Sequence, residues 1–329
     1  MARRRLTVDA YEEGVLAGDR AVLARAITLV ESRRPADGEL AQDLLTKLLP
    51  RCGAAIRAGI TGPPGVGKST LLDALGMDLL ARGHRVAVLA VDPSSSVSGG
   101  SILGDKTRMA RLAVADGAFI RPSPSAASLG GVTRRTRETM VLCEAAGFDV
   151  LLVETVGVGQ SETMVADMVD HFVALTLPNS GDELQGIKKG VLELADVLAV
   201  NKSDGDALPA ARRALRELQA AMRYLRPRRA DWRPRTLMVS GLQGEGLDAL
   251  WQAVLDHREA LEASGALATL RAEQQRRWMW SMIEERLLRS FREAPAVAQR
   301  LADLEEQVAA GATTPSRAAD QLLAAFSGD

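Results

Sequence analysis

Aromatic residues are scarce in this chain of 329 residues, since Phe, Trp and Tyr make up only 3% of it. Proteins that hold single-stranded nucleic acid or carbohydrate stack bases or sugar rings on aromatic side chains, so this scarcity argues against both ligands. Positive charge is not in excess either, because 41 Lys and Arg stand against 42 Asp and Glu, for a formal net charge of -1. The chain as a whole lacks the basic footprint of a nucleic-acid-binding protein, and we expect no such partner.

Cysteine and histidine are equally sparse. The two cysteines, Cys52 and Cys143, lie far apart and show neither the spacing of a disulfide framework nor that of a Cys-based zinc site. The three histidines, His84, His171 and His257, are scattered along the chain. We therefore expect reduced thiols, no transition-metal site, and histidines at the surface of helices or loops.

Long apolar runs are missing as well. The longest, such as Val86 to Val91, have the length of a strand and fall far short of the ~20 residues that cross a bilayer. Glu12 and Glu13 occur where an export signal would have its apolar stretch. The sequence therefore predicts a soluble cytoplasmic protein that does not associate with membranes.

The chain has three regions of different texture. Residues 1–54 carry apolar positions at helical spacing and predict an N-terminal helical extension. In residues 55–258, brief Val/Ile/Leu runs alternate with stretches of helix length, which predicts an α/β domain with a mostly parallel sheet. Residues 259–329 show no strand-like run and predict a C-terminal helical arm. The strand-like runs are 56–60, 86–91, 150–153, 197–200 and 236–239, with a further apolar stretch at 172–177.

The C-terminal region holds Trp278 and Trp280 in one apolar cluster that needs a partner surface. The cluster packs either onto the α/β domain of the same chain or against a second copy of the chain. The sequence leaves both alternatives open.

A phosphate-binding motif follows the first strand-like run and precedes a helical stretch. Its residues are Gly62, Pro63, Pro64, Gly65, Val66, Gly67, Lys68, Ser69 and Thr70. This is the Walker A pattern in the strand–loop–helix context that it requires. The glycines let backbone N–H groups surround the phosphates, Lys68 reaches the outer phosphates, and Ser69 offers a hydroxyl to Mg²⁺. The motif predicts nucleotide binding.

Two later loops bear on the identity of the base. Asn201, Lys202, Ser203 and Asp204 follow the run 197–200. A carboxylate at Asp204 accepts hydrogen bonds from the ring N–H and the exocyclic amine of guanine, whereas adenine has no such pair of donors. Asn201 and Lys202 would brace the loop and cover the ring. The backbone of Ser240, Gly241 and Leu242, after the last run, would meet the guanine carbonyl oxygen, although an ordinary strand-end turn explains this tripeptide equally well. GTP is favoured over ATP.

Carboxylates follow two more strand-like runs, at Asp92 and Glu154. The carboxyl ends of parallel strands meet at one edge of a sheet, so both are expected near the Walker loop, where they would hold Mg²⁺. Glu154 or a neighbour would position the attacking water, and the N–H of Gly157 would approach the γ-phosphate. Asp105 is a further candidate Mg²⁺ ligand, with a helix N-cap as its alternative.

Several polar segments accompany these motifs. The Ser/Gly-rich residues 93–109 resemble a switch loop. Residues 178–190 suit either a partner-sensing loop or an ordinary solvated one. Arg134, Arg135 and Arg137 form a basic patch that suits an arginine finger or a partner contact, and we interpret it as a solvated helix face, the more common case. The arginine-rich residues 224–235 are interpreted as a surface loop.

Longer blocks of sequence resemble the MeaB family of methylmalonyl-CoA mutase-associated G proteins, which is related to the methylmalonic aciduria type A protein. The resemblance spans about residues 57–255, and the blocks that carry it are 91–96, 99–109, 119–124, 154–162 and 181–190. It implies a dimerising (SIMIBI-type) P-loop GTPase that acts as a homodimer. It also implies a chaperone of the adenosylcobalamin-dependent mutase, which gates cofactor delivery and protects the enzyme from inactivation.

The resemblance also implies roles for single residues. Ser69, Asp92, Asp105 and Glu154 would form the magnesium sphere. Lys68, Asp92, Glu154 and Gly157 would serve catalysis. Residues 93–109 and 154–162 would be switches I and II, and 178–188 a third switch in which Asp182, Gln185 and Lys188 sense the partner. We expect slow intrinsic hydrolysis, because no Gln or Arg is clearly placed to orient the water or to neutralise charge.

Three other readings compete with this one. A nickel-insertion maturation GTPase would need a His-rich tract or a Cys/His pair, which the sequence lacks. A transport-associated ATPase or kinase matches an older label of the same family, and the loop 201–204 argues against it. A scaffold that binds nucleotide without turnover is the third reading.

Overall fold

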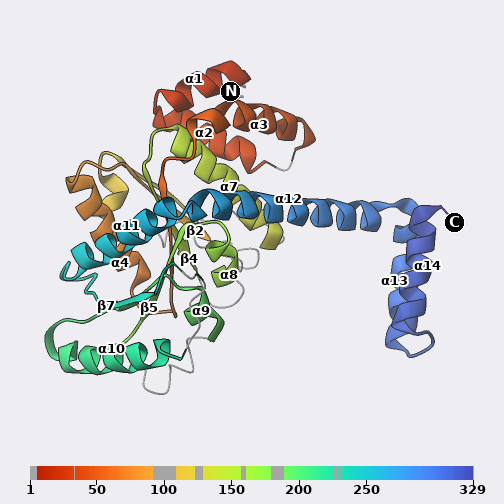
Figure 1. Ribbon diagram of the computed structural model, residues 1–329. Helices are drawn as coiled ribbons and strands as arrows, with labels where there is room; N and C mark the ends of the chain where they lie inside the picture. The colour runs from red at the N-terminus through yellow and green to blue at the C-terminus, as the bar shows by residue number, and fades with distance from the viewer. Residues whose placement is uncertain are drawn as a thin grey trace. The chain divides into compact units, whose positions relative to one another are not determined.

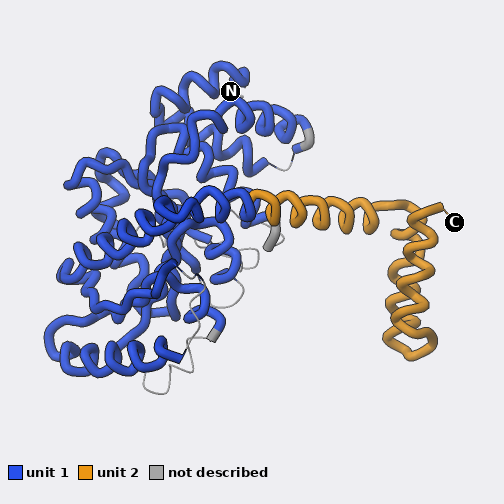
Figure 2. Tube along the Cα trace, viewed as in Figure 1, with its two compact units in different colours: residues 1–274 blue, residues 275–329 orange. Residues whose placement is uncertain are grey.

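The computed structural model describes residues 6–32, 34–91, 109–122, 129–156, 161–178, 189–224, 229 and 231–328. The chain forms two compact units, residues 1–274 and residues 275–329 (Figure 2).

The first unit is built on a β-sheet (Figure 1). Within the described residues this sheet has seven strands, and every pair of neighbouring strands is parallel. The strand order is β3-β2-β4-β1-β5-β6-β7. The strands are β1 Ile56–Thr61, β2 Val86–Val91, β3 Ala118–Arg121, β4 Val150–Thr155, β5 His171–Thr176, β6 Val197–Val200 and β7 Arg235–Met238. The predicted α/β fold with a parallel sheet is confirmed. The edge strand β3 was missed because only its first residue is buried, so it presents no apolar run.

Helices of the first unit lie on both faces of the sheet (Figure 1). The described helices of the two units are α1 Val8–Leu16, α2 Arg20–Val30, α3 Pro35–Leu48, α4 Lys68–Ala81, α7 Leu129–Ala145, α8 Ser161–Ala166, α9 Lys189–Leu194, α10 Leu208–Met222, α11 Leu247–Ala263, α12 Ala266–Glu293, α13 Pro295–Ala309 and α14 Pro315–Ser327, of which α13 and α14 belong to the second unit. Short 3-10 turns occur at 49–51, 112–114 and 205–207. The helical extensions predicted at both ends of the chain are present.

Side chains of the strands point alternately to the two faces of the sheet and pack into a hydrophobic core on each face. In β5, Phe172 packs into the core beneath α7 and α8, whereas Val173 and Leu175 pack into the core beneath α4 and α11. Successive residues of a strand point to opposite faces, so a sheet covered on both faces needs apolar residues at nearly every position. This requirement explains why the strands were visible in the sequence as continuous apolar runs.

The N-terminal helices belong to the first unit and share its core. Leu23 and Ile27 of α2 and Leu44 of α3 are fully buried in the same cluster as Leu142 of α7. Asp19 begins α2 by accepting a hydrogen bond from the backbone N–H of Ala21 at 2.8 Å. The extension is therefore an integral layer over α7.

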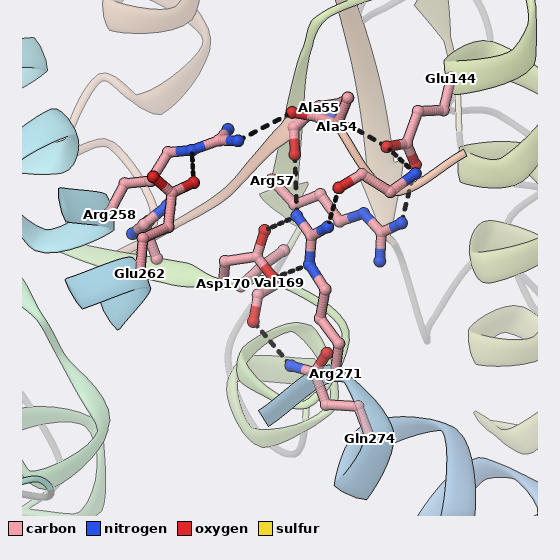
Figure 3. Close-up of polar contacts among 12 residues, drawn as sticks. Ala54, Ala55, Arg57, Glu144, Val169, Asp170, Arg258, Glu262, Arg271 and Gln274 are labelled. Carbon is pink, nitrogen blue, oxygen red and sulfur yellow. Dashed lines mark hydrogen bonds and ion pairs between the residues drawn. The ribbon is translucent and has the colours of Figure 1, made fainter. Parts of the chain in front are cut away.

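The segment that joins this extension to β1 is held by the carboxylate of Glu144 on α7 (Figure 3). One carboxylate oxygen accepts hydrogen bonds from the N–H groups of Gly53 and Ala55, at 2.7 and 2.8 Å. The other pairs with Arg57 at 2.7 Å. Every oxygen of this buried carboxylate thus has a donor, as burial of a charge requires.

Side chains of two helices, α12 and α7, hold the turn between α8 and β5 by hydrogen bonds to its backbone. Gln274 of α12 donates to the carbonyl oxygen of Val169 at 2.7 Å (Figure 3). Arg137 of α7 donates to the carbonyl oxygen of Asp167 at 2.6 Å. Arg137 is buried. The solvated helix face expected for Arg137 is therefore wrong, because its guanidinium caps backbone carbonyls inside the unit.

Two of the three histidines are also buried, which corrects the expectation that all three lie at the surface. His171 opens β5, His257 lies on α11, and their Nδ1 atoms are 3.0 Å apart. Burial lowers the pKa of each imidazole to about 3, with nearby Arg258 adding to the effect at His171 and the neighbouring imidazole at His257. Both rings are neutral at physiological pH.

In the second unit, α13 and α14 pack against each other through Val297, Leu304 and Ala318. The rings of Phe291 and Phe326 meet at 5.3 Å between centroids. The large apolar side chains of this unit that stay exposed in the single chain are Met279, Trp280, Leu287, Leu288, Leu323 and Phe326. Within the described residues of both units, no helix combines the length and the apolar character needed to cross a membrane.

Candidate nucleotide-binding site

The Walker segment forms the connection between β1 and α4, in the middle of the sheet. Three of its glycines, Gly62, Gly65 and Gly67, adopt positive φ angles of 148°, 78° and 94°. Gly67 is the N-cap of α4, so the loop ends at a helix N-terminus, whose first N–H groups point away from the helix body. A Cβ on Gly67 would lie 2.8 Å from Nδ2 of Asn201. Backbone conformation and space both require glycine here.

Lys68 begins α4 and is buried. Its Nζ donates to the carbonyl oxygen of Gly62 at 2.7 Å and lies 3.3 Å from that of Pro63. The ammonium group is thus folded back over the loop that precedes it. This places a positive charge at a helix N-terminus. Phosphate groups are attracted there both by the ammonium group and by the N–H groups and dipole of the helix.

Ser69 and Glu154 meet beside this loop. The Ser69 hydroxyl donates to Oε1 of Glu154 at 3.0 Å, and Glu154 is buried in β4, the neighbour of β1. Hydroxyl and carboxylate oxygens are the ligands that Mg²⁺ prefers. The pair therefore fits an Mg²⁺ ion chemically, although no group of three His, Cys, Asp or Glu within the described residues forms a cage for a metal. Mg²⁺ typically takes one or two carboxylates together with nucleotide phosphates.

Two buried threonines join the same strand ends, and sequence reasoning missed them. Thr61 and Thr155 are the last residues of β1 and β4, and their hydroxyl oxygens are 2.9 Å apart. The available signal was a polar residue closing an otherwise apolar strand. Their contact fixes the two strand ends from which the Walker loop and Glu154 project.

Asn201 joins three segments that are distant in sequence. Its side-chain amide donates to the carbonyl oxygen of Val66 at 2.8 Å, and its amide oxygen accepts from the N–H of Gly241 at 3.1 Å. The residue is buried at the carboxyl end of β6. One side chain thus ties the Walker loop to both loops expected to hold the base.

Asp204 lies in the same place. Its carboxylate accepts a hydrogen bond from the hydroxyl of Ser240, whose oxygen in turn accepts from the N–H of Gln243 at 3.0 Å. Gly241 packs so tightly that a Cβ there would lie 2.8 Å from Cα of Leu71 on α4. The structure therefore brings the loops 201–204 and 240–242 together, beside the start of α4. Lys202 is exposed with a positive φ of 58°, and Leu242 is exposed.

Part of the predicted site lies outside the described residues. These positions are Asp92, Asp105 and Gly157, with Asp182, Gln185 and Lys188 of the expected partner-sensing loop. Of the predicted site, the structure brings together the Walker residues, Ser69 with Glu154, and the two base loops.

Comparison with known proteins gives one family. Residues 23–296 match the model of the family described as methylmalonyl Co-A mutase-associated GTPase MeaB. A protein named putative GTPase from Caulobacter vibrioides is 59% identical over 98% of both chains. The mouse protein named methylmalonic aciduria type A homolog, mitochondrial, is 48% identical over 97% of this chain and 79% of its own length.

The same comparison extends to a solved structure. The crystal structure of a protein named LAO/AO transport system kinase superposes with a TM-score of 0.78 at 40% identity, and the match covers 98% of both chains. The fold described above, with its helical extensions, is therefore that of an experimentally determined relative.

Proposed function

This chain belongs to the MeaB family and is a GTPase, and from that premise we propose that it is the G-protein chaperone of an adenosylcobalamin-dependent methylmalonyl-CoA mutase. In this role it gates delivery of the cofactor and protects the mutase from inactivation. The match to the family model over residues 23–296 is the observation that carries the choice of partner.

The guanine base is held between the two loops that Asn201 joins. The Asp204 carboxylate accepts hydrogen bonds from the ring N–H and the exocyclic amine of guanine. In the loop 240–242, the N–H of Leu242 faces the guanine carbonyl oxygen, because those of Ser240 and Gly241 donate to Glu245 and Asn201. Lys202, whose side chain is exposed, covers the ring. The contacts that Asn201 and Asp204 make with the Walker loop and the loop 240–242 support this placement.

Hydrolysis proceeds by in-line attack of water on the γ-phosphate. The Walker N–H groups and Lys68 stabilise the charge that develops on the phosphate oxygens. Ser69 and Glu154, with Asp92 and Asp105, would hold Mg²⁺, which would neutralise phosphate charge. Glu154 or a neighbouring group orients the water, and the N–H of Gly157 contacts the γ-phosphate.

The intrinsic rate of GTP hydrolysis is slow, because part of the negative charge of the transition state is not neutralised in the protein alone. Binding of a partner that supplies the missing group would lower the activation barrier. The third switch, with Asp182, Gln185 and Lys188, senses that partner. Coupling of nucleotide state to partner affinity is necessarily reciprocal.

We assign the remaining organisation in the same way. Residues 1–54 form the helical extension, 55–258 the GTPase domain and 259–329 a dimerisation arm. The exposed apolar side chains of the arm, Trp280 and Leu288 among them, supply the surface by which two copies associate into a homodimer. The protein acts in the cytoplasm, whereas the mouse relative is named mitochondrial.

A second candidate follows from the solved relative, which is named a transport system kinase. A transport-associated ATPase would need to accept adenine at the base loops. The carboxylate of Asp204 beside Ser240 favours guanine instead.

Phosphate release from GTP and from ATP, measured with Mg²⁺ and with or without purified mutase, tests the proposal. We expect slow turnover of GTP that the mutase accelerates, and no turnover of ATP. GTP turnover that is indifferent to the mutase would overturn the choice of partner. Preference for ATP would overturn the role of Asp204.

A further inference from the structure

Positive charge is concentrated in one stretch of this nearly neutral chain. Residues 208–235 contain nine arginines and only two acidic residues, Glu217 and Asp231. The stretch therefore carries +7, and because the whole chain carries -1, the other 301 residues carry -8. None of the proposed steps of GTP binding or hydrolysis uses these arginines.

Four of the described arginines of this stretch lie on α10 or at its C-terminal end. Arg212, Arg213 and Arg216 of α10 and Arg223, its C-cap, are all exposed. At 100° per residue, Arg212, Arg216 and Arg223 fall within an arc of about 40°. They extend over roughly 16 Å along the helix axis. These four residues are called the arginine face below.

The arginine face lacks the compensation that other surface helices have. Elsewhere, arginines pair with acids one turn away, as in Arg258 with Glu262 and Arg289 with Glu285. No ion pair or side-chain hydrogen bond involves the four arginines among the described residues, whereas the nearby Arg235 pairs with Asp256 at 2.5 Å. Arg212 and Arg216 are instead like charges at i,i+4, a spacing that destabilises an isolated helix. Glu217 lies one turn from Arg213, yet no ion pair joins these two described residues.

A different side of α10 packs on the domain itself. Ala211 and Leu218 are buried, and Leu215 and Met222 pack with them on the core at β6. An amphipathic helix that binds a bilayer needs its apolar side for lipid, and here that side is not available. The acidic remainder of the chain and the small number of aromatics disfavour a nucleic acid. A protein surface that carries carboxylates fits best, because the planar guanidinium group of an exposed arginine forms two parallel hydrogen bonds with a carboxylate.

We propose that the arginine face of α10 docks an acidic patch of the partner protein. This inference rests on the proposed function, in which that partner is the mutase. The helix follows the loop 201–204 after a single 3-10 turn, Gly205–Ala207, so a partner seated on it lies directly next to the segment expected to hold guanine. Complementary charge of this kind raises the association rate and is weakened by salt.

The test compares two charge-reversal variants of the full-length protein, R212E/R216E on the arginine face and R34E/R51E as the control. The control arginines are exposed and lie on other elements, so both variants change the net charge equally. Affinity for immobilised mutase is measured at 50 and 300 mM salt. We expect R212E/R216E to bind about tenfold or more weakly at low salt, and the control to bind within about twofold of the wild type.

Melting temperature and basal GTP turnover of each variant verify that fold and site are intact. Equal binding by R212E/R216E and the wild type would overturn the arginine face and leave the proposed function standing. If the wild-type protein does not bind the mutase, both the docking role of the arginine face and the proposed function are wrong. If the arginine face instead carries binding to a DNA duplex or to phosphatidylserine vesicles, and not to the mutase, a different class of partner replaces the one proposed here.

Discussion

The guanidinium of Arg271 lies in a bidentate pair on the buried carboxylate of Asp170, with Nε to Oδ1 at 2.9 Å and Nη2 to Oδ2 at 2.6 Å. The same guanidinium donates to the carbonyl oxygens of Gly53 and Ala55, in the segment that leads into β1 (Figure 3). One side chain from the start of α12 thus joins the turn before β5 to the N-terminal connection.

Replacing Arg271 by Met is expected to lower the free energy of unfolding by about 3–5 kcal/mol, because Asp170 would keep a buried charge without its partner. Urea denaturation measures the change. The control is Arg289→Met, which removes an exposed i,i+4 pair with Glu285 and should cost about 0.3–0.5 kcal/mol. A loss below about 1 kcal/mol for the Arg271 variant would contradict the assigned role.

The buried pair of His171 and His257 makes stability depend on pH. Burial lowers the pKa of both imidazoles to about 3, against 6.5 for an unfolded chain. Below pH 6.5 the unfolded state binds more protons than the folded state, so the stabilising effect is complete above pH 6.5 and is lost as the pH falls toward 3. Each imidazole contributes a slope of up to about 1.4 kcal/mol per pH unit.

Urea denaturation between pH 7.5 and 5 checks this dependence. The variant H171Q/H257Q should show a flatter profile across that range. A profile as steep as that of the wild type would assign the acid sensitivity to other groups.

Gly67→Ala is expected to weaken nucleotide binding without removing any side chain. The positive φ costs an alanine about 1–2 kcal/mol, and the new Cβ would lie 2.8 Å from Nδ2 of Asn201. Gly83→Ala carries the same backbone strain, at φ 88°, but has open space around its Cβ. Titration with a fluorescent GTP analogue should therefore show lower affinity for the Gly67 variant alone. If the two variants bind the analogue with equal affinity, the contact of the new Cβ with Asn201 does not weaken nucleotide binding, and the prediction is wrong.

Ser69→Ala tests the proposed metal ligand. Loss of the hydroxyl should reduce Mg²⁺-dependent GTP turnover by on the order of 100-fold, as removal of one group that stabilises transition-state charge does elsewhere. Ser69→Thr keeps the hydroxyl and should restore most of the rate. Failure of the threonine variant to exceed the alanine variant would show that the hydroxyl is not the group that matters.

Asp204→Asn tests the recognition of the base. Only one of the two terminal atoms of an amide is an acceptor, so Asn cannot face both donors of guanine, but its NH₂ can donate to the second carbonyl of xanthine. The variant should therefore lose affinity for GTP by roughly 100-fold and gain affinity for xanthosine triphosphate. Competition binding with both nucleotides provides the measurement. Unchanged preference for GTP would move base recognition away from Asp204.

The sequence by itself determined the features that are encoded locally. The Walker loop was predictable because residues 62–70 are contiguous and their glycines, lysine and serine act through the backbone of one turn. Most strands were predictable because a sheet covered on both faces needs continuous apolar runs. The loop at Asn201 and Asp204 was found by its position after such a run.

Only the tertiary structure decided which distant residues meet. His171 and His257 looked like isolated surface residues, yet the order of the strands places β5 beneath α11 and buries both rings. Arg271 and Asp170 are 101 positions apart, and Asn201 contacts the Walker loop from 135 positions away. Such contacts depend on strand order and helix packing, and no local pattern of residues specifies these.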